Sequence, residues 1–155
     1  MPDFELTLDQ ARLLLLRNRL KAAGASGLTR ELNKALRDAA KPIAEAERQA
    51  ALALPASRSP QPGGLRESLA AGVKVAVTTS ARNPGVRVRD RAKLAKAVQR
   101  RGGWRHPVYG NRRHWVTQTL GEGGWFNRIA YAHRDEVRRK VKEAVDRIAH
   151  KIAKG

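Results

Sequence analysis

The sequence predicts an α+β fold, with N-terminal helices and a long C-terminal helix packed on a small antiparallel β-sheet. Apolar side chains recur every three or four positions over residues 28–50 and 127–154, which stacks them on one face of a helix. Valines alternate with polar residues in "GVKVAVTTS" and "GVRVRD", and the turn-forming "ARNPG" separates the two runs. This pattern indicates a β-hairpin with one apolar face and one basic face.

The N-terminal residues favour a separate helix. Thr7 and Gln10 have the spacing of a capping box, and "GASG" at residues 24–27 interrupts the pattern that follows, so we expect a helix from Leu8 to about Ala23. We assign residues 1–24 to an N-terminal helical extension and residues 25–155 to a single α+β domain.

A second helix is expected from Leu28. Its apolar face comprises Leu32, Leu36, Ala39, Ile43, Ala46 and Ala50. Pro42 lies inside this pattern and removes one backbone hydrogen bond, so we expect a kink near Arg37 and Asp38 rather than an end. The proline- and glycine-rich residues 54–64 form an irregular connection within the domain.

Three further elements complete the predicted fold. Residues 91–101 favour a short helix with Leu94 and Val98 on one side, and residues 114–120 favour another strand. The last helix is expected from about Asn127, as its cap, to Lys154. Its apolar stripe consists of Val137, Val141, Val145, Ile148 and Ile152.

Composition excludes several classes of function. The 155 residues include no cysteine, which excludes disulfides, thiolate metal sites and a cysteine nucleophile. The net charge of +18 favours a polyanion, an acidic protein surface or an anionic membrane as partner. Acidic residues near the start and an apolar run of only four leucines do not fit an export signal or a membrane span, so we expect action in a cytoplasm or in something assembled there.

Positive charge is concentrated in residues 72–103, which carry nine basic side chains and one acidic side chain. Such a segment can release counterions from a nucleic-acid backbone, although a solvated basic face is the simpler alternative. The same residues contain no Phe, Tyr or Trp, which argues against a reader of single strands. No helix-turn-helix or zinc-finger pattern is present, so base-specific recognition is not predicted.

The segment "GGWRHPVYGNRRHWVTQ", residues 102–118, combines aromatic, glycine and histidine residues at the highest density in the chain. His106, Asn111 and His114 are too closely spaced for a ββα nuclease site and have no carboxylate beside them, and the four histidines do not suggest a zinc site. No catalytic serine motif or phosphate-binding loop is recognisable, so we expect no enzyme, no metal and no cofactor. Pro107 and the glycines instead predict a rigid connector and packing loop.

The layout resembles the neck or tail-completion proteins of long-tailed bacteriophages, particularly the arginine-rich versions from phages of actinobacteria. The resemblance covers about residues 28–154 and includes "GGLRESLAAGVKVAV", "RHPVYGNRRHWVTQ" and "GGWFNRIAYAHRDEVRRKVKEAVDRIAHKIAK". Its most specific residues are His106, Pro107, Gly110, Trp115, Gln118, Trp125 and Phe126. With Trp104 and Tyr109, these form the expected structural loop or interface.

The resemblance implies a virion structural protein that forms a ring at the head-to-tail interface and surrounds the DNA channel. Six copies would match the tail symmetry and twelve the portal. The implied partners are head-closure or adaptor proteins, tail-terminator or tail-tube proteins and packaged double-stranded DNA, with no membrane. Assembly is expected in the host cytoplasm, and the adjacent tail terminator remains an alternative identity.

Seven cations are candidates for the channel wall: Arg82, Arg87, Arg89, Lys93, Lys96, Arg100 and Arg101. The competing hypothesis places them against acidic neighbours in the neck. The alternative function is a small basic protein that binds nucleic acid non-specifically.

Overall fold

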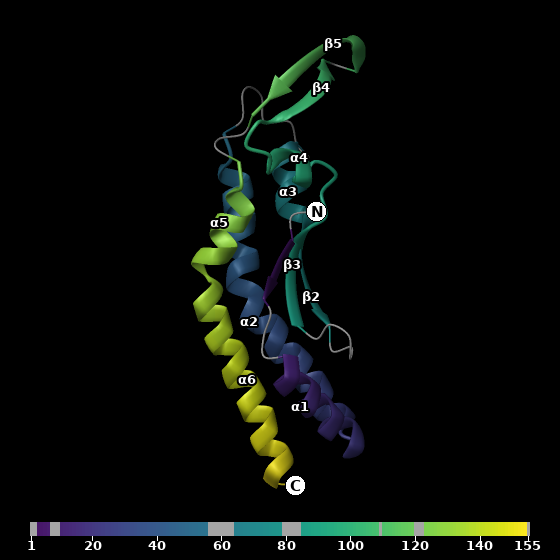
Figure 1. Ribbon diagram of the computed structural model, residues 1–155, viewed down its shortest axis with the longest axis vertical. Helices are drawn as coiled ribbons and strands as arrows, with labels where there is room; N and C mark the ends of the chain where they lie inside the picture. Colours follow the sequence, from purple (N-terminus) through teal and green to yellow (C-terminus); the bar gives the residue numbers. More distant parts are fainter. Residues whose placement is uncertain are drawn as a thin grey trace.

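The computed structural model describes residues 3–6, 10–55, 64–78, 85–108, 110–119 and 123–154. The elements in chain order are β1 (Asp3–Leu6), α1 (Gln10–Ala22), α2 (Ser26–Ala53), α3 (Leu65–Gly72), β2 (Val73–Thr78), β3 (Gly85–Asp90), α4 (Ala95–Val98), β4 (Trp104–Val108), β5 (Asn111–Gln118), α5 (Trp125–Ala132) and α6 (Arg134–Lys154). They build an elongated molecule in which α2 and α6 run side by side and the β4–β5 hairpin projects beyond one end (Figure 1). The predicted α+β class is confirmed.

The main sheet is antiparallel and has the strand order β1-β3-β2. Val75 lies opposite Val88 and Val77 opposite Val86, so the hairpin predicted from alternating valines is confirmed. These valines face α2, while Arg87 and Arg89 lie on the other face of β3, where they are half-buried.

Strand β1 was not predicted. It pairs with the second edge of β3, where Asp3 lies opposite Arg89 and Glu5 opposite Arg87. A partner 80 or more positions away leaves no signal in a local sequence pattern. The division of the chain at residue 24 stays a prediction.

Helix α1 begins at Gln10, close to the expected position, and buries Leu13, Leu16 and Leu20. Helix α2 continues through Pro42, so the expectation that the proline does not end it is confirmed, while the kink stays a prediction. The predicted apolar face is correct up to Ile43. Beyond Ile43, the residues that the helix turns toward the core are Ala44, Glu47 and Ala51, whereas Ala46 and Ala50 are half-buried.

The C-terminal residues form two helices rather than the single helix predicted. His133 separates α5 from α6, and α5 begins after Gly124 rather than at Asn127. Gly123 and Gly124 both have positive φ, and a Cβ on Gly123 would lie 2.9 Å from backbone atoms of Arg100 and Arg101. Only glycine fits this close approach.

The predicted stripe of α6 is confirmed. Val137, Val141 and Ile148 are buried, and Val145 and Ile152 pack against the core as partly buried residues. The core lies between α2, the sheet, α5 and α6, with Phe126, Leu32, Leu36 and Leu69 among its fully buried side chains.

Two shorter helices differ from expectation. Helix α3 was not predicted and buries Leu69 and Ala70. Helix α4 is the expected short helix, but it buries Ala95 and Val98 while Leu94 is 42% exposed, because the helix is a single turn that begins after Leu94. Several predicted features lie outside the described residues: the cap at Thr7, most of the turn at residues 81–85, and the site residues Arg82 and Tyr109.

Candidate functional site

The segment that the sequence predicts to be a rigid loop leading into a strand at residues 114–120 is a β-hairpin, β4 and β5, which we call the arm. Its strands form a separate antiparallel sheet with Trp104 opposite Gln118, His106 opposite Val116 and Pro107 opposite Trp115. The predicted strand is confirmed as β5, although β5 begins at Asn111 and ends at Gln118, whereas β4 was missed because Pro107 is unusual in a strand and the register shifts directly after it. The arm stands off the body of the molecule (Figure 1).

Glycines shape both ends of the arm. Gly110, near the tip, has φ of 78°, which other residues rarely adopt. Gly103, at the base, has φ of 75°, and a Cβ there would lie 2.2 Å from the carbonyl oxygen of Gln118. Trp104 is buried at the base and belongs to the core, so it anchors the arm.

Contacts between neighbouring side chains hold the arm together. One ring nitrogen of His106, Nε2, lies 3.0 Å from Oε1 of Gln118, and its ring stacks on Trp104 with centroids 5.9 Å apart. Trp115 donates from Nε1 to the carbonyl oxygen of Arg112 at 2.7 Å, and the Arg105 guanidinium lies 5.5 Å from the centre of the Trp115 ring. His106 is therefore part of the contacts that hold the arm together, whereas His114 is exposed.

The arm is cationic. Its sequence from residue 104 to residue 119 holds three arginines and two histidines but no acidic residue. Arg105 lies on the face of Trp115, whereas Arg112, Arg113 and His114 lie where β5 has no partners on β4, between Asn111 opposite Val108 and Trp115 opposite Pro107. All residues of β5 except Gln118 are exposed. The arm therefore presents uncompensated charge to its surroundings.

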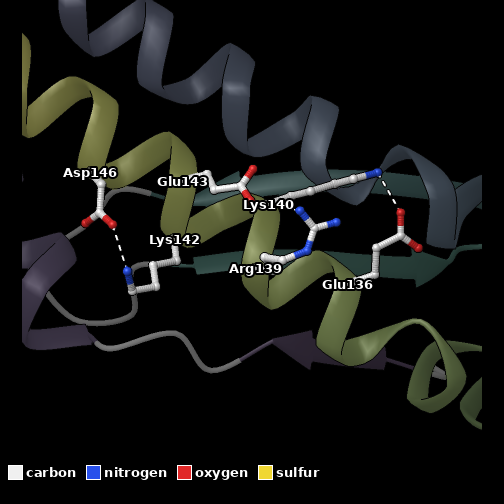
Figure 2. Close-up of polar contacts among 6 residues, drawn as sticks. All are labelled: Glu136, Arg139, Lys140, Lys142, Glu143 and Asp146. Carbon is white, nitrogen blue, oxygen red and sulfur yellow. Dashed lines mark hydrogen bonds and ion pairs between the residues drawn. The ribbon is translucent and has the colours of Figure 1, made fainter.

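The exposed side of α6 is different, because carboxylates of the same helix pair with several of its cations, although its eight lysines and arginines still outnumber its four acidic residues. Figure 2 shows the side chains that pair along one helix: Lys140 with Glu136 at 2.7 Å, Arg139 with Glu143 at 2.8 Å and Lys142 with Asp146 at 2.9 Å. These pairs lower the pKa values of the Glu136 and Asp146 carboxyl groups, mainly through hydrogen bonds from Lys140 and Lys142. Exposed ion pairs of this kind stabilise a helix only slightly, but they reduce the positive electrostatic potential around it.

The predicted channel residues fall into two groups. Arg87 and Arg89 are half-buried on the sheet, where each has interactions within the chain. The remaining described members surround α4, which lies at the base of the arm (Figure 1), and are exposed: Lys93, Lys96, Arg100 and Arg101. Two residues predicted for the loop or interface, Trp125 and Phe126, instead lie buried in the core at the start of α5.

Sequence reasoning missed a pair of buried carboxyl groups, Glu47 on α2 and Asp90 at the end of β3. Both residues are 0% exposed, and burial together with the charge of Asp90 raises the pKa of Glu47 to about 9. Burial also raises the pKa of Asp90, partly opposed by the Ala92 amide, which donates to Oδ1 at 2.9 Å. The available signal was the position of Glu47, four residues after Ile43 and thus in phase with the apolar face.

Neither a metal site nor a membrane span emerges from the part of the chain that is described. Within it, no three His, Asp or Glu side chains lie close enough to hold a metal ion, and no helix has the length and apolar character needed to cross a bilayer.

Comparison with protein-family models, with curated proteins and with solved structures found no match. The class of this protein is therefore defined by its own fold: an α+β protein whose helices cover a small sheet and whose basic arm extends from one end.

Proposed function

We propose that this chain is a non-enzymatic virion structural protein of a long-tailed bacteriophage. It would form a ring at the head-to-tail interface, join the portal complex to the tail tube and surround the DNA channel. The proposal combines the resemblance over residues 28–154 with the geometry of the arm. Six copies are favoured by the tail symmetry, and twelve would match the portal.

The arm is the observation that carries the proposal. Five residues most specific to the resemblance lie in it: His106, Pro107, Gly110, Trp115 and Gln118. They shape a hairpin that reaches beyond the body, and Trp115 at 44% exposure is one of its apolar side chains open to solvent. A two-stranded hairpin alone is marginally stable in water, so contacts with another molecule would stabilise it.

A ring with head-to-tail contacts requires two different surfaces on each subunit. One candidate for such a surface is a groove of about 490 Å³ between α1 and α6. Leu13, Val141 and Val145 form its apolar floor, and Arg12 and Arg138 are among the cations at its rim. The groove and the arm lie in different parts of the elongated molecule (Figure 1), which suits contacts with different neighbours.

Electron microscopy of the tailed particle whose genome encodes this chain tests the proposal. We expect a closed ring of copies between the portal and the tail tube, beside the head-closure or adaptor and the tail-terminator or tail-tube proteins. Mass spectrometry of purified particles supplies the control, because a chain absent from them cannot be a virion component.

The second candidate is a small basic protein that binds nucleic acid non-specifically, and the acid-free sequence of the arm favours it. The two functions differ in assembly. Salt-sensitive DNA binding by the monomer, combined with absence from the virion, would select the second candidate.

A further inference from the structure

We infer that the arm is a duplex-DNA-binding ribbon that inserts β4 and β5 into a groove of the double helix and contacts phosphates on both sides. The inference deepens the proposed function, on which it rests for the identity of packaged DNA as the target. It assigns the main DNA contact to the arm, whereas the seven cations predicted from the sequence belong to the sequence of the β2–β3 hairpin and of the segment that follows it.

Exposure of both faces distinguishes a groove from a protein surface. A sheet that docks on a protein buries one face and leaves the other face solvated, so its recognition residues gather on one side. Trp115 and Val116 point to opposite faces of β5 and both are exposed, as are Arg105, Arg112 and Arg113. A ribbon between two rows of phosphates has an anionic wall on each side, which matches a cationic arm that is open on both faces.

The shape of the arm also fits. The major groove of B-DNA admits a two-stranded β-ribbon. The arm is such a ribbon, it projects from the body, and β5 is exposed along nearly its whole length (Figure 1). The four exposed cations around α4 lie at its base, where they can continue the contact along the phosphate backbone.

The sheet face is a weaker candidate. Arg87 and Arg89 are half-buried and already interact within the chain. The register also places them opposite Glu5 and Asp3 of β1, so this part of the sheet combines both signs of charge in its sequence. No equivalent acidic residue occurs in the arm.

The amide side chains of the arm are engaged within it. Asparagine and glutamine amides are common readers of adenine, but Oδ1 of Asn111 accepts the Arg113 backbone amide at 3.0 Å and Oε1 of Gln118 lies 3.0 Å from His106. Because these groups hold the arm together, we expect no preference for adenine at the bound site.

Titration of a short labelled duplex with the full chain, over a range of salt concentrations, tests the inference. Each phosphate contact contributes a slope of about 0.9 in log K against log salt, so Arg112→Gln/Arg113→Gln should reduce the slope by about 2. Arg134→Gln/Arg147→Gln removes the same charge from exposed positions of α6 and should leave the slope nearly unchanged. Circular dichroism verifies that both variants are folded.

Trp115 supplies an independent readout, since it is exposed whereas Trp104 and Trp125 are buried. Duplex binding should change tryptophan fluorescence in the wild type, and Trp115→Phe should remove most of that change. Fluorescence insensitive to saturating duplex would place the contact elsewhere and overturn the inference.

Three other results would also overturn it: no binding to duplex, equal loss of slope in the two arginine pairs, or arm-dependent binding of poly-glutamate as tight as that of DNA. The last result would assign the arm to an acidic protein. A ring in the virion without DNA binding would remove this inference and leave the proposed function intact. Arm-dependent DNA binding by a chain that is absent from virions would support DNA binding by the arm and contradict the proposed function.

Discussion

At the scale of single residues, a carboxyl group without a hydrogen-bond partner in the described chain lies between α2 and the sheet. Both oxygens of Glu47 are buried, and its pKa of about 9 in the fold exceeds the ordinary 4.5. Between pH 4.5 and about 9, the folded protein therefore keeps a proton on Glu47 that the unfolded chain has already released. Stability falls as pH rises through this window, by at most about 1.4 kcal/mol per pH unit.

Glu47→Gln should remove most of this pH dependence, because the amide is neutral at every pH. Urea unfolding at several pH values should give a free energy of unfolding that declines toward alkaline pH in the wild type and declines less in the variant. Asp90 is unchanged in both proteins, so the difference between the curves isolates Glu47. Parallel curves would mean that Glu47 titrates normally in the fold.

Gly72 lies at the end of α3, directly against Asp90. A Cβ at Gly72 would lie 2.2 Å from Oδ1 of Asp90 and 2.7 Å from the backbone nitrogen of Ala92. Gly72→Ala should therefore destabilise the fold by about 1–3 kcal/mol, measured by denaturant unfolding. Gly27→Ala is the matched control, since its Cβ would meet nothing within 4 Å and the helix should gain up to about 1 kcal/mol. Equal effects at the two sites would contradict the described packing.

At the scale of elements, the arm and the body should fold as separable units. Replacing residues 106–116 with Asn-Gly joins Arg105 to Thr117, which are opposite each other in the register, through a favoured hairpin turn. Because β4 and β5 pack chiefly on each other, the free energy of unfolding should change by less than about 1 kcal/mol. Thermal unfolding followed by circular dichroism measures this change.

The anchor of the arm provides the contrast. Trp104 is buried in the core, so Trp104→Ala should cost about 3–5 kcal/mol even though the arm keeps its length. For the variant in which Asn-Gly replaces residues 106–116, loss of the helical circular dichroism signal would show instead that folding of the body depends on the arm.

Sequence patterns predicted elements that bury one face locally. Alternating valines predicted β2 and β3, and the spacing of apolar residues predicted α2 and the stripe of α6. The pattern failed where a partner distant in sequence decides the structure, as for β1, or where a charged residue occupies an apolar position, as for Glu47. It predicted β5 but mistook β4 for a loop, because Pro107 and the flanking glycines are typical of loops.

At the scale of the whole molecule, the net charge of +18 opposes assembly of identical subunits. The field is uneven, because the cations shown in Figure 2 are paired along α6 while the arm has no acidic residue. In the proposed ring, arms that converge on the channel would concentrate this repulsion. Salt shortens the range of such repulsion from about 30 Å at 0.01 M to about 10 Å at 0.1 M.

Oligomers of the isolated chain should therefore become more abundant as salt concentration rises, in sedimentation velocity experiments at fixed protein concentration. Arg112→Gln/Arg113→Gln should assemble at lower salt than the wild type, because it removes charge from the arms. Arg134→Gln/Arg147→Gln removes the same charge from α6, outside the groove, and should shift assembly less, provided that the arms lie nearest to one another in the ring. Oligomers that dissociate as salt increases would show instead that ion pairs between subunits hold the assembly together, since screening weakens attraction between charges as it weakens repulsion.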